Sequence, residues 1–237
     1  MHIQRVEQSN AHFTINSLVY TPDASRDRGL TVLMGHGFSV SKHHLDGLAS
    51  YLCYFGYEVV NVDFPGHKMG GSRGSLDHPV QLIESLKLAR RCTKRDNIVL
   101  LGHSMGAAAA VGAATEMDEA IGLVALGMGA NPAARFEDKI VTSTLEWGAL
   151  YVEDLDGKDF LTRIKSELLP HMKNVTVPSL VIGGTKDYII PAQEVKKLAE
   201  MAQGPRTVKL LDCTHSDLPD VAKKDIRQWL EQTYSID

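Results

Sequence analysis

Cysteine is scarce in this chain of 237 residues, which contains only Cys53, Cys92 and Cys213. The three are widely spaced and form no C-x-x-C pair. A sparse and odd set argues against a disulfide framework and suits a reducing compartment. Long apolar runs are also missing: no segment approaches the roughly eighteen residues of a membrane-spanning helix, and residues 1–7 hold no apolar signal core. We therefore expect a cytoplasmic protein without a membrane span.

An excess of positive charge is absent as well. The chain has 25 lysines and arginines against 29 acidic residues, a formal net charge of -4. Proteins that bind nucleic acid usually carry a basic surface, so we expect no nucleic-acid partner. The hydrophobic fraction of 43% and the charged fraction of 23% are ordinary for a soluble globular protein. The length fits one domain with a full core, or one domain with a short insertion.

Short apolar segments alternate with helical segments along most of the chain. Strands are predicted at residues 2–7, 12–20, 30–34, 57–64, 97–101, 121–128, 179–183 and 206–211. Helices are predicted at residues 42–55, 77–90, 107–114, 191–202 and 218–230. Such alternation predicts an α/β fold with a mostly parallel central sheet and helices on both faces.

The alternation is interrupted over residues 130–177. This interval is too rich in apolar residues for a disordered loop. It is predicted to form a small lid with at least one amphipathic helix, near residues 158–169. The core would then consist of residues 1–129 and 178–237. The apolar residues of the interval would serve equally as the interface of a homodimer, and the sequence leaves both uses open.

A serine lies between two glycines in Gly102-His103-Ser104-Met105-Gly106. The segment follows the apolar run at residues 97–101 and precedes the alanine-rich residues 107–114. This context predicts a strand, a sharp turn and a helix. Glycines on both sides allow the turn to be tight and closely packed, so the Ser104 hydroxyl would project from the end of the sheet.

Ligands of open α/β sheets bind at the carboxyl ends of the strands. Ser104, Asp187 and His215 each follow a predicted strand, in that order. A serine hydroxyl needs a base to become a nucleophile, a role that fits His215, and Asp187 would orient the imidazole. The backbone amides of Phe38 and Met105 are the natural donors for an oxyanion. The alternatives are that Asp187 caps the following helix and that His215 is a solvated loop residue.

Other residues invite a functional interpretation. Trp147 and Tyr151 would either line the substrate pocket or form a small core of the lid. His36, His43 and His44 do not match the spacing of a common zinc site, and His43 and His44 are expected at the exposed start of a helix. Glycine-rich segments lack the context of a phosphate-binding fingerprint. We therefore expect neither a metal ion nor an organic cofactor.

The chain resembles the α/β-hydrolase fold superfamily from about residue 12 to residue 235. The matching segments are residues 36–38, 63–72, 102–106, 183–191 and 214–215. The resemblance implies a catalytic triad of Ser104, Asp187 and His215, with an oxyanion hole at Phe38 and Met105. Segment 63–72, which is usually structural in the family, has Lys68-Met69 where many members have glycine after histidine. This departure is expected to reshape the rim of the pocket.

Within the superfamily, the short lid and the Gly-His-Ser-Met-Gly turn resemble small serine carboxylesterases, monoacylglycerol-lipase-like enzymes and acyl thioesterases. Residues 151–187 also resemble cinnamoyl and feruloyl esterases. The resemblance implies a carboxylic ester hydrolase that acts on small-molecule esters, with short- to medium-chain acyl or aryl groups, through an acyl-serine intermediate. The alternatives are an acyl thioesterase, an amidase or a carbon–carbon bond hydrolase with the same triad, and a non-catalytic ligand-binding module of the same fold.

Overall fold

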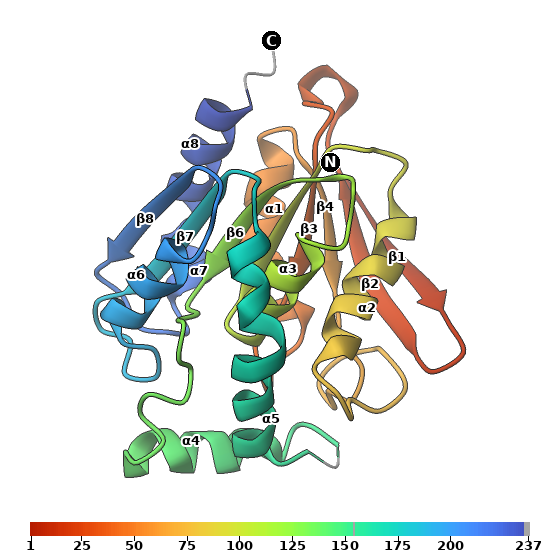
Figure 1. The fold of residues 1–237 in the computed structure, drawn as a ribbon. Helices are drawn as coiled ribbons and strands as arrows, with labels where there is room; N and C mark the ends of the chain where they lie inside the picture. The colour runs from red at the N-terminus through yellow and green to blue at the C-terminus, as the bar shows by residue number, and fades with distance from the viewer. Residues whose placement is uncertain (154, 235–237) are drawn as a thin grey trace.

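The computed structural model describes residues 1–153 and 155–234 (Figure 1). Within them one sheet contains β1 (His2–Ser9), β2 (Thr14–Thr21), β3 (Thr31–Gly35), β4 (Glu58–Val62), β5 (Ile98–His103), β6 (Ala120–Leu126), β7 (Ser179–Gly184) and β8 (Arg206–Leu211). The spatial order is β1-β2-β4-β3-β5-β6-β7-β8. β2 is antiparallel to both of its neighbours, and all the other neighbouring strands are parallel. The predicted α/β fold with a mostly parallel sheet is confirmed.

Helices cover both faces of this sheet (Figure 1). One face carries α1 (Asp46–Tyr54), α7 (Leu218–Val221) and α8 (Lys223–Thr233), and the other carries α2 (Val80–Ala89), α3 (Met105–Ala113) and α6 (Ala192–Glu200). Successive side chains of a strand point to opposite faces. Accordingly, Val32 and Met34 of β3 pack in one hydrophobic cluster and Leu33 in the other. The strands β3 to β7 are buried on both sides, which explains their continuous apolar runs, whereas the edge strands β1 and β8 are largely exposed.

Two predicted helices differ from the observed ones. The helix expected at residues 42–55 begins with a 3-10 turn, η2 (Lys42–Leu45), before α1. The helix expected at residues 218–230 is divided at Ala222 into α7 and α8. The remaining 3-10 turns of the core are η1 (Ala24–Arg26) and η3 (Arg90–Cys92).

Residues 127–178, which we call the insert, lie between β6 and β7. These two strands are parallel neighbours, so the insert leaves at the carboxyl end of β6 and returns to the amino end of β7, at the opposite edge of the sheet. It contains α4 (Lys139–Ala149), α5 (Gly157–Arg163), the π-helical turn η4 (Ile164–Leu168) and the 3-10 helix η5 (Leu169–Asn174). The helix predicted near residues 158–169 corresponds to α5 and η4, whereas α4 was not predicted. That the insert acts as a lid stays a prediction.

None of the helices in the described part of the chain is long and apolar enough to cross a membrane.

Candidate active site

Ser104 lies in the sharp turn between β5 and α3. Its backbone is left-handed, with φ 53° and ψ -119°, a conformation that costs a non-glycine residue about 1–3 kcal/mol. Neighbouring glycines make the turn possible. A Cβ atom on Gly102 would lie 2.0 Å from the Gly106 carbonyl oxygen, and one on Gly106 would lie 2.1 Å from the Gly35 carbonyl oxygen. The two glycines therefore let β3, β5 and α3 approach closely enough to hold the serine in place.

Asp187 and His215 follow β7 and β8 and contact each other directly. Asp187 Oδ2 and His215 Nδ1 are 2.6 Å apart. A carboxylate can only accept, so Nδ1 carries the proton and Nε2 remains free to accept one. Asp187 Oδ1 accepts hydrogen bonds from the backbone amides of Ile189 (2.8 Å) and Ile190 (2.9 Å). These bonds fix the carboxylate in the β7–α6 loop, and Asp187 is not the cap of α6, which begins after Pro191.

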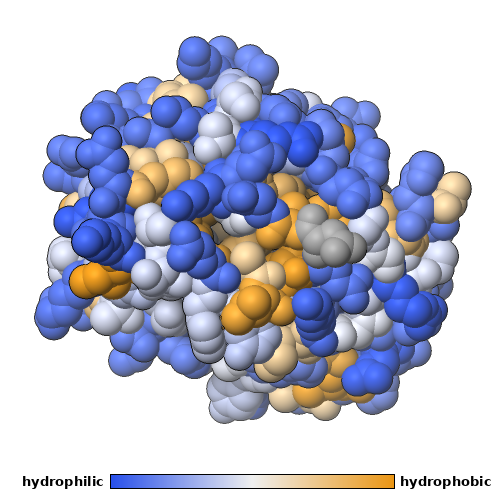
Figure 2. Space-filling view, turned by 90° about the horizontal axis from the view of Figure 1, so that it is seen from below, coloured by the Kyte–Doolittle hydropathy of each residue, from blue (hydrophilic) through white to orange (hydrophobic). Residues whose placement is uncertain are grey.

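Ser104 and His215 line the same cavity, which has a volume of about 290 Å³. In the described part of the chain the Ser104 hydroxyl donates no hydrogen bond. Catalytic hydrogen bonds are often long until a substrate binds. Apolar side chains from the insert and from the β7–α6 loop form much of the wall, among them Met128, Pro132, Leu145, Leu161, Ile189 and Ile190. Figure 2, seen from below Figure 1, shows apolar side chains gathered between polar ones on this face.

The backbone amides of Phe38, in the loop after β3, and of Met105, the first residue of α3, are without a backbone acceptor in the described part of the chain. Amides in the first turn of a helix lack intrahelical partners and carry partial positive charge. Both amides therefore remain available to a negatively charged oxygen.

Of the two residues that were proposed to line the substrate pocket, one lines the cavity. Trp147 lines the cavity, whereas Tyr151 is not among its described lining residues; its ring packs against Trp147, with 5.1 Å between centroids. His43 is exposed as expected and binds Asp46. His44 was predicted at the exposed start of a helix, but it lines the cavity. Its position shortly after a strand that ends at this edge of the sheet was the available signal.

Lys68, at the departure from the family pattern, contacts the insert. Its backbone amide donates to the Tyr151 carbonyl (2.9 Å) and its Nζ to the Leu150 carbonyl (3.0 Å). Met69 is exposed and does not line the described wall of the cavity. Lys68 thus connects the core to the insert, and the predicted change of the pocket rim stays a prediction.

Three histidines are buried at or just beyond the ends of β3, β4 and β5. His36 is 0% exposed, and His67 and His103 are each 3% exposed. Burial lowers the pKa of all three, to about 3 for His36 and well below the ordinary value for His103. His103 Nε2 donates to the His215 carbonyl (3.0 Å) and so supports the loop that holds His215.

Acidification should destabilise the fold because of these three histidines. In the unfolded chain each takes up a proton below its ordinary pKa of 6.5, whereas in the native state it stays neutral to lower pH. Their contribution to stability is therefore fully present above pH 6.5 and is lost as the pH falls. Each contributes at most about 1.4 kcal/mol per pH unit, in the range where it is protonated in the unfolded chain and neutral in the native state.

Urea unfolding at pH values between 7 and 5 measures this effect. The free energy of unfolding should fall with increasing slope below about pH 6.5. The exposed His12 provides a control, because His12→Gln should leave the slope unchanged. A free energy of unfolding that stays constant over this range would contradict the prediction.

Comparisons with known proteins bear on the family and the fold of the chain. The sequence profile described as the alpha/beta hydrolase family matches residues 32–224. A Mycoplasma genitalium protein that carries an esterase/lipase name is 32% identical over 90 residues, which are 38% of this chain and 32% of that protein. The match thus spans about a third of the length of this curated relative.

Two solved structures share the fold over nearly the whole chain. The esterase Pf2001 of Pyrococcus furiosus has a TM-score of 0.73 and 22% identity, covering 98% of this chain and 93% of that one. Est1E of Butyrivibrio proteoclasticus, solved with ferulic acid bound, has a TM-score of 0.73 and 16% identity, covering 96% and 98%. At sequence identities of 22% and 16% the structural similarity shows the fold alone.

Proposed function

The chain belongs to the alpha/beta hydrolase family, and from this premise we propose that it is a serine hydrolase of carboxylic esters. In this proposal Ser104 is the nucleophile and His215 the general base. Asp187 orients His215 and stabilises its positive charge during the reaction. The backbone amides of Phe38 and Met105 form the oxyanion hole.

The reaction proceeds through an acyl-serine. His215 Nε2 removes the hydroxyl proton of Ser104 as Ser104 Oγ attacks the ester carbonyl carbon. Negative charge then develops on the carbonyl oxygen, which accepts from the two amides. The bond to the alcohol oxygen breaks, and His215 returns its proton to that oxygen. In the second half His215 takes a proton from water, which attacks the acyl carbon, and Ser104 Oγ regains a proton as the carboxylic acid leaves.

One observation carries this proposal: the 2.6 Å hydrogen bond between Asp187 and His215, with His215 in the wall of the cavity that Ser104 also lines. The strained backbone of Ser104 supports it, because such strain persists only where the surrounding structure enforces it and is frequent at functional sites. A serine that merely connected a strand to a helix would gain nothing from this conformation.

The size of the cavity favours short- to medium-chain acyl groups or aryl groups. Its volume of about 290 Å³ lies at the lower end of ligand pockets, which span roughly 300–1,000 Å³. Outside the wall formed by Trp147 and Tyr188, a more open groove continues along α4 past Lys139 and Ile140. A long acyl chain would have to pass this wall.

Hydrolysis of p-nitrophenyl esters from acetate to palmitate tests the proposal, together with matched thioesters. We expect turnover with an optimum at short to medium chain length. An optimum at palmitate would contradict the proposed substrate class, and faster turnover of the thioesters would identify an acyl thioesterase. Absence of all turnover, with Ser104 still reactive toward a fluorophosphonate, would favour a carbon–carbon bond hydrolase or a binding module.

Removal of the Trp147 side chain should shift the chain-length preference. Trp147→Ala should widen the connection between the cavity and the outer groove, because Trp147 lines both. We expect kcat/KM for decanoate relative to butyrate to rise about tenfold, the size of effect that a few methylenes have in an apolar pocket. Tyr151→Ala serves as the comparison and should change the ratio less. An unchanged ratio in Trp147→Ala would remove Trp147 from the substrate wall.

A further inference from the structure

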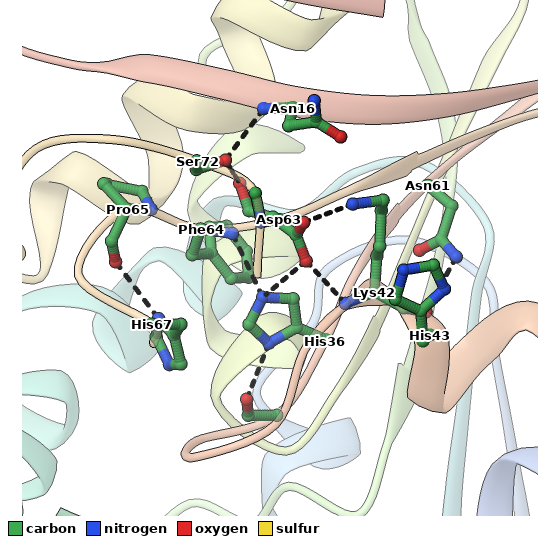
Figure 3. Close-up of polar contacts among 12 residues, drawn as sticks. Asn16, His36, Lys42, His43, Asn61, Asp63, Phe64, Pro65, His67 and Ser72 are labelled. Carbon is green, nitrogen blue, oxygen red and sulfur yellow. Dashed lines mark hydrogen bonds and ion pairs between the residues drawn. The ribbon is translucent and has the colours of Figure 1, made fainter. Parts of the chain in front are cut away.

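A buried ion pair lies outside the cavity, between the loop after β3 and the end of β4. Its members are Lys42 and Asp63, whose side chains are 2% and 0% exposed. Lysine is almost never buried unless it is paired. Neither residue belongs to the described wall of the cavity, so the pair has no direct contact with a bound substrate. Figure 3 shows both side chains with their polar contacts.

The ion pair also binds the backbone of Lys42. Asp63 Oδ1 accepts from the Lys42 backbone amide (2.8 Å), while Oδ2 accepts from Lys42 Nζ and from the Gly71 amide (2.8 Å). Asn61 Nδ2 donates to the Lys42 carbonyl (2.9 Å). Both peptide groups of Lys42 are therefore tied to residues 61–63. We call Lys42, Asn61 and Asp63 the clamp.

The other end of the same loop is tied to the same segment. His36 Nε2 accepts from the Phe64 backbone amide (3.0 Å), which places the proton on Nδ1, and Nδ1 donates to the Gly37 carbonyl (2.8 Å). Residues 37–41 thus form a short bridge whose ends, at residues 36 and 42, are both held by residues 61–64. The bridge contains Phe38 and the left-handed Ser39, with φ 63°.

We propose that Lys42 and Asp63 are positioning residues that hold the Phe38 amide at the place where the oxyanion forms. This inference rests on the proposed ester hydrolysis, in which that amide acts on the tetrahedral intermediate. Stability alone does not account for the pair, because apolar residues of similar volume often replace a buried ion pair without loss. A carboxylate, unlike an apolar side chain, fixes a backbone amide by accepting from it.

Paired substitutions test the clamp without leaving a charge unpaired in the interior. In the first variant Lys42→Met is combined with Asp63→Leu, which removes every acceptor for the amide of residue 42. In the second Lys42→Met is combined with Asp63→Asn, which retains a side-chain oxygen that can accept from it. Lys209→Met with Asp225→Leu is the matched control, because this ion pair joins β8 to α8, away from the loop.

The leucine variant should lower kcat about ten- to a hundredfold and leave KM within about twofold, since a donor to the oxyanion acts in the transition state. The asparagine variant should recover most of this loss. Affinity for a trifluoromethyl ketone, which forms an oxyanion on the serine, should fall in parallel with kcat. The control should keep kcat within about twofold, whatever its melting temperature.

A folded leucine variant with unchanged kcat would overturn the proposal, and so would an equal loss of kcat in the control. Should the leucine variant fail to fold, Asn61→Leu removes the bond to the Lys42 carbonyl, together with a longer one to Asp46 Oδ1 (3.3 Å), and leaves Lys42 and Asp63 in place. It should lower kcat about three- to tenfold, and an unchanged kcat would overturn the proposal. The proposed function is tested separately: the wild type should hydrolyse esters, and Ser104→Ala should abolish this activity. A wild type that hydrolyses no ester would refute both the proposed function and the positioning role of Lys42 and Asp63.

Discussion

Replacement of Ser104 with alanine should reduce kcat for a short-chain p-nitrophenyl ester by about 10⁴- to 10⁶-fold. The reason is that no acyl-serine can form, so that only binding and the oxyanion donors still act on the substrate. KM should change little, because the hydroxyl contributes mainly in the transition state. Steady-state rates with highly purified protein, corrected for spontaneous hydrolysis, measure this loss.

Ser166→Ala provides the matched control for this substitution. Ser166 is an exposed serine in η4 whose hydroxyl lies within hydrogen-bond distance of the Thr162 and Arg163 carbonyls at the end of α5. Its removal should leave kcat within about twofold of wild type. A loss below about tenfold in Ser104→Ala would mean that the attacking group is another residue or a water molecule.

Replacement of Asp187 with asparagine should lower kcat about 10⁴-fold and preserve the fold. The amide oxygen can still accept from Ile189 and Ile190, as Asp187 Oδ1 does now. The amide nitrogen would face His215 Nδ1, however, and would favour the tautomer that carries its proton on Nε2. That tautomer cannot accept the proton of Ser104, which is why such a substitution is costly in a triad.

Asp212→Asn is the control, since Asp212 is an exposed carboxylate near the end of β8 that pairs with Lys186. Circular dichroism should show an intact fold in both variants. If Asp187→Asn retained more than about a tenth of the wild-type kcat, Asp187 would not be the residue that orients His215.

Much of the fold follows from local signals. The central strands β3 to β7 are nearly continuous apolar runs because parallel strands inside a sheet are buried on both faces. The turn at Ser104 could be predicted from Gly102 and Gly106, because any larger residue at these positions would clash where β3, β5 and α3 approach one another. Ser104, Asp187 and His215 each follow a parallel strand, and the carboxyl ends of parallel strands meet at one edge of the sheet. Their position at this edge could therefore be predicted.

Other features depend on contacts between distant segments. Lys42 and Asp63 are 21 residues apart, and nothing in the sequence near Lys42 indicates that its side chain is buried. His44 was expected to be exposed. It lines the cavity because of the path that the chain takes after β3.

The insert posed a similar problem. α4 buries Val141, Leu145 and Gly148, one of which has no side chain. The buried positions have helical spacing, but exposed apolar residues such as Ile140 and Trp147 lie on the other side of the helix, and α4 was not predicted. For Tyr151, spacing alone could not decide between the cavity and the surface of Trp147.

The central claim is that Ser104 carries the acyl group, and labelling with a fluorophosphonate tests it most directly. Intact mass should show one adduct per chain, and peptide mapping should place it on Ser104, with loss of esterase activity in proportion to labelling. Ser104→Ala should gain no adduct. An adduct on a different residue, or full ester turnover by a protein that remains unlabelled, would contradict the account.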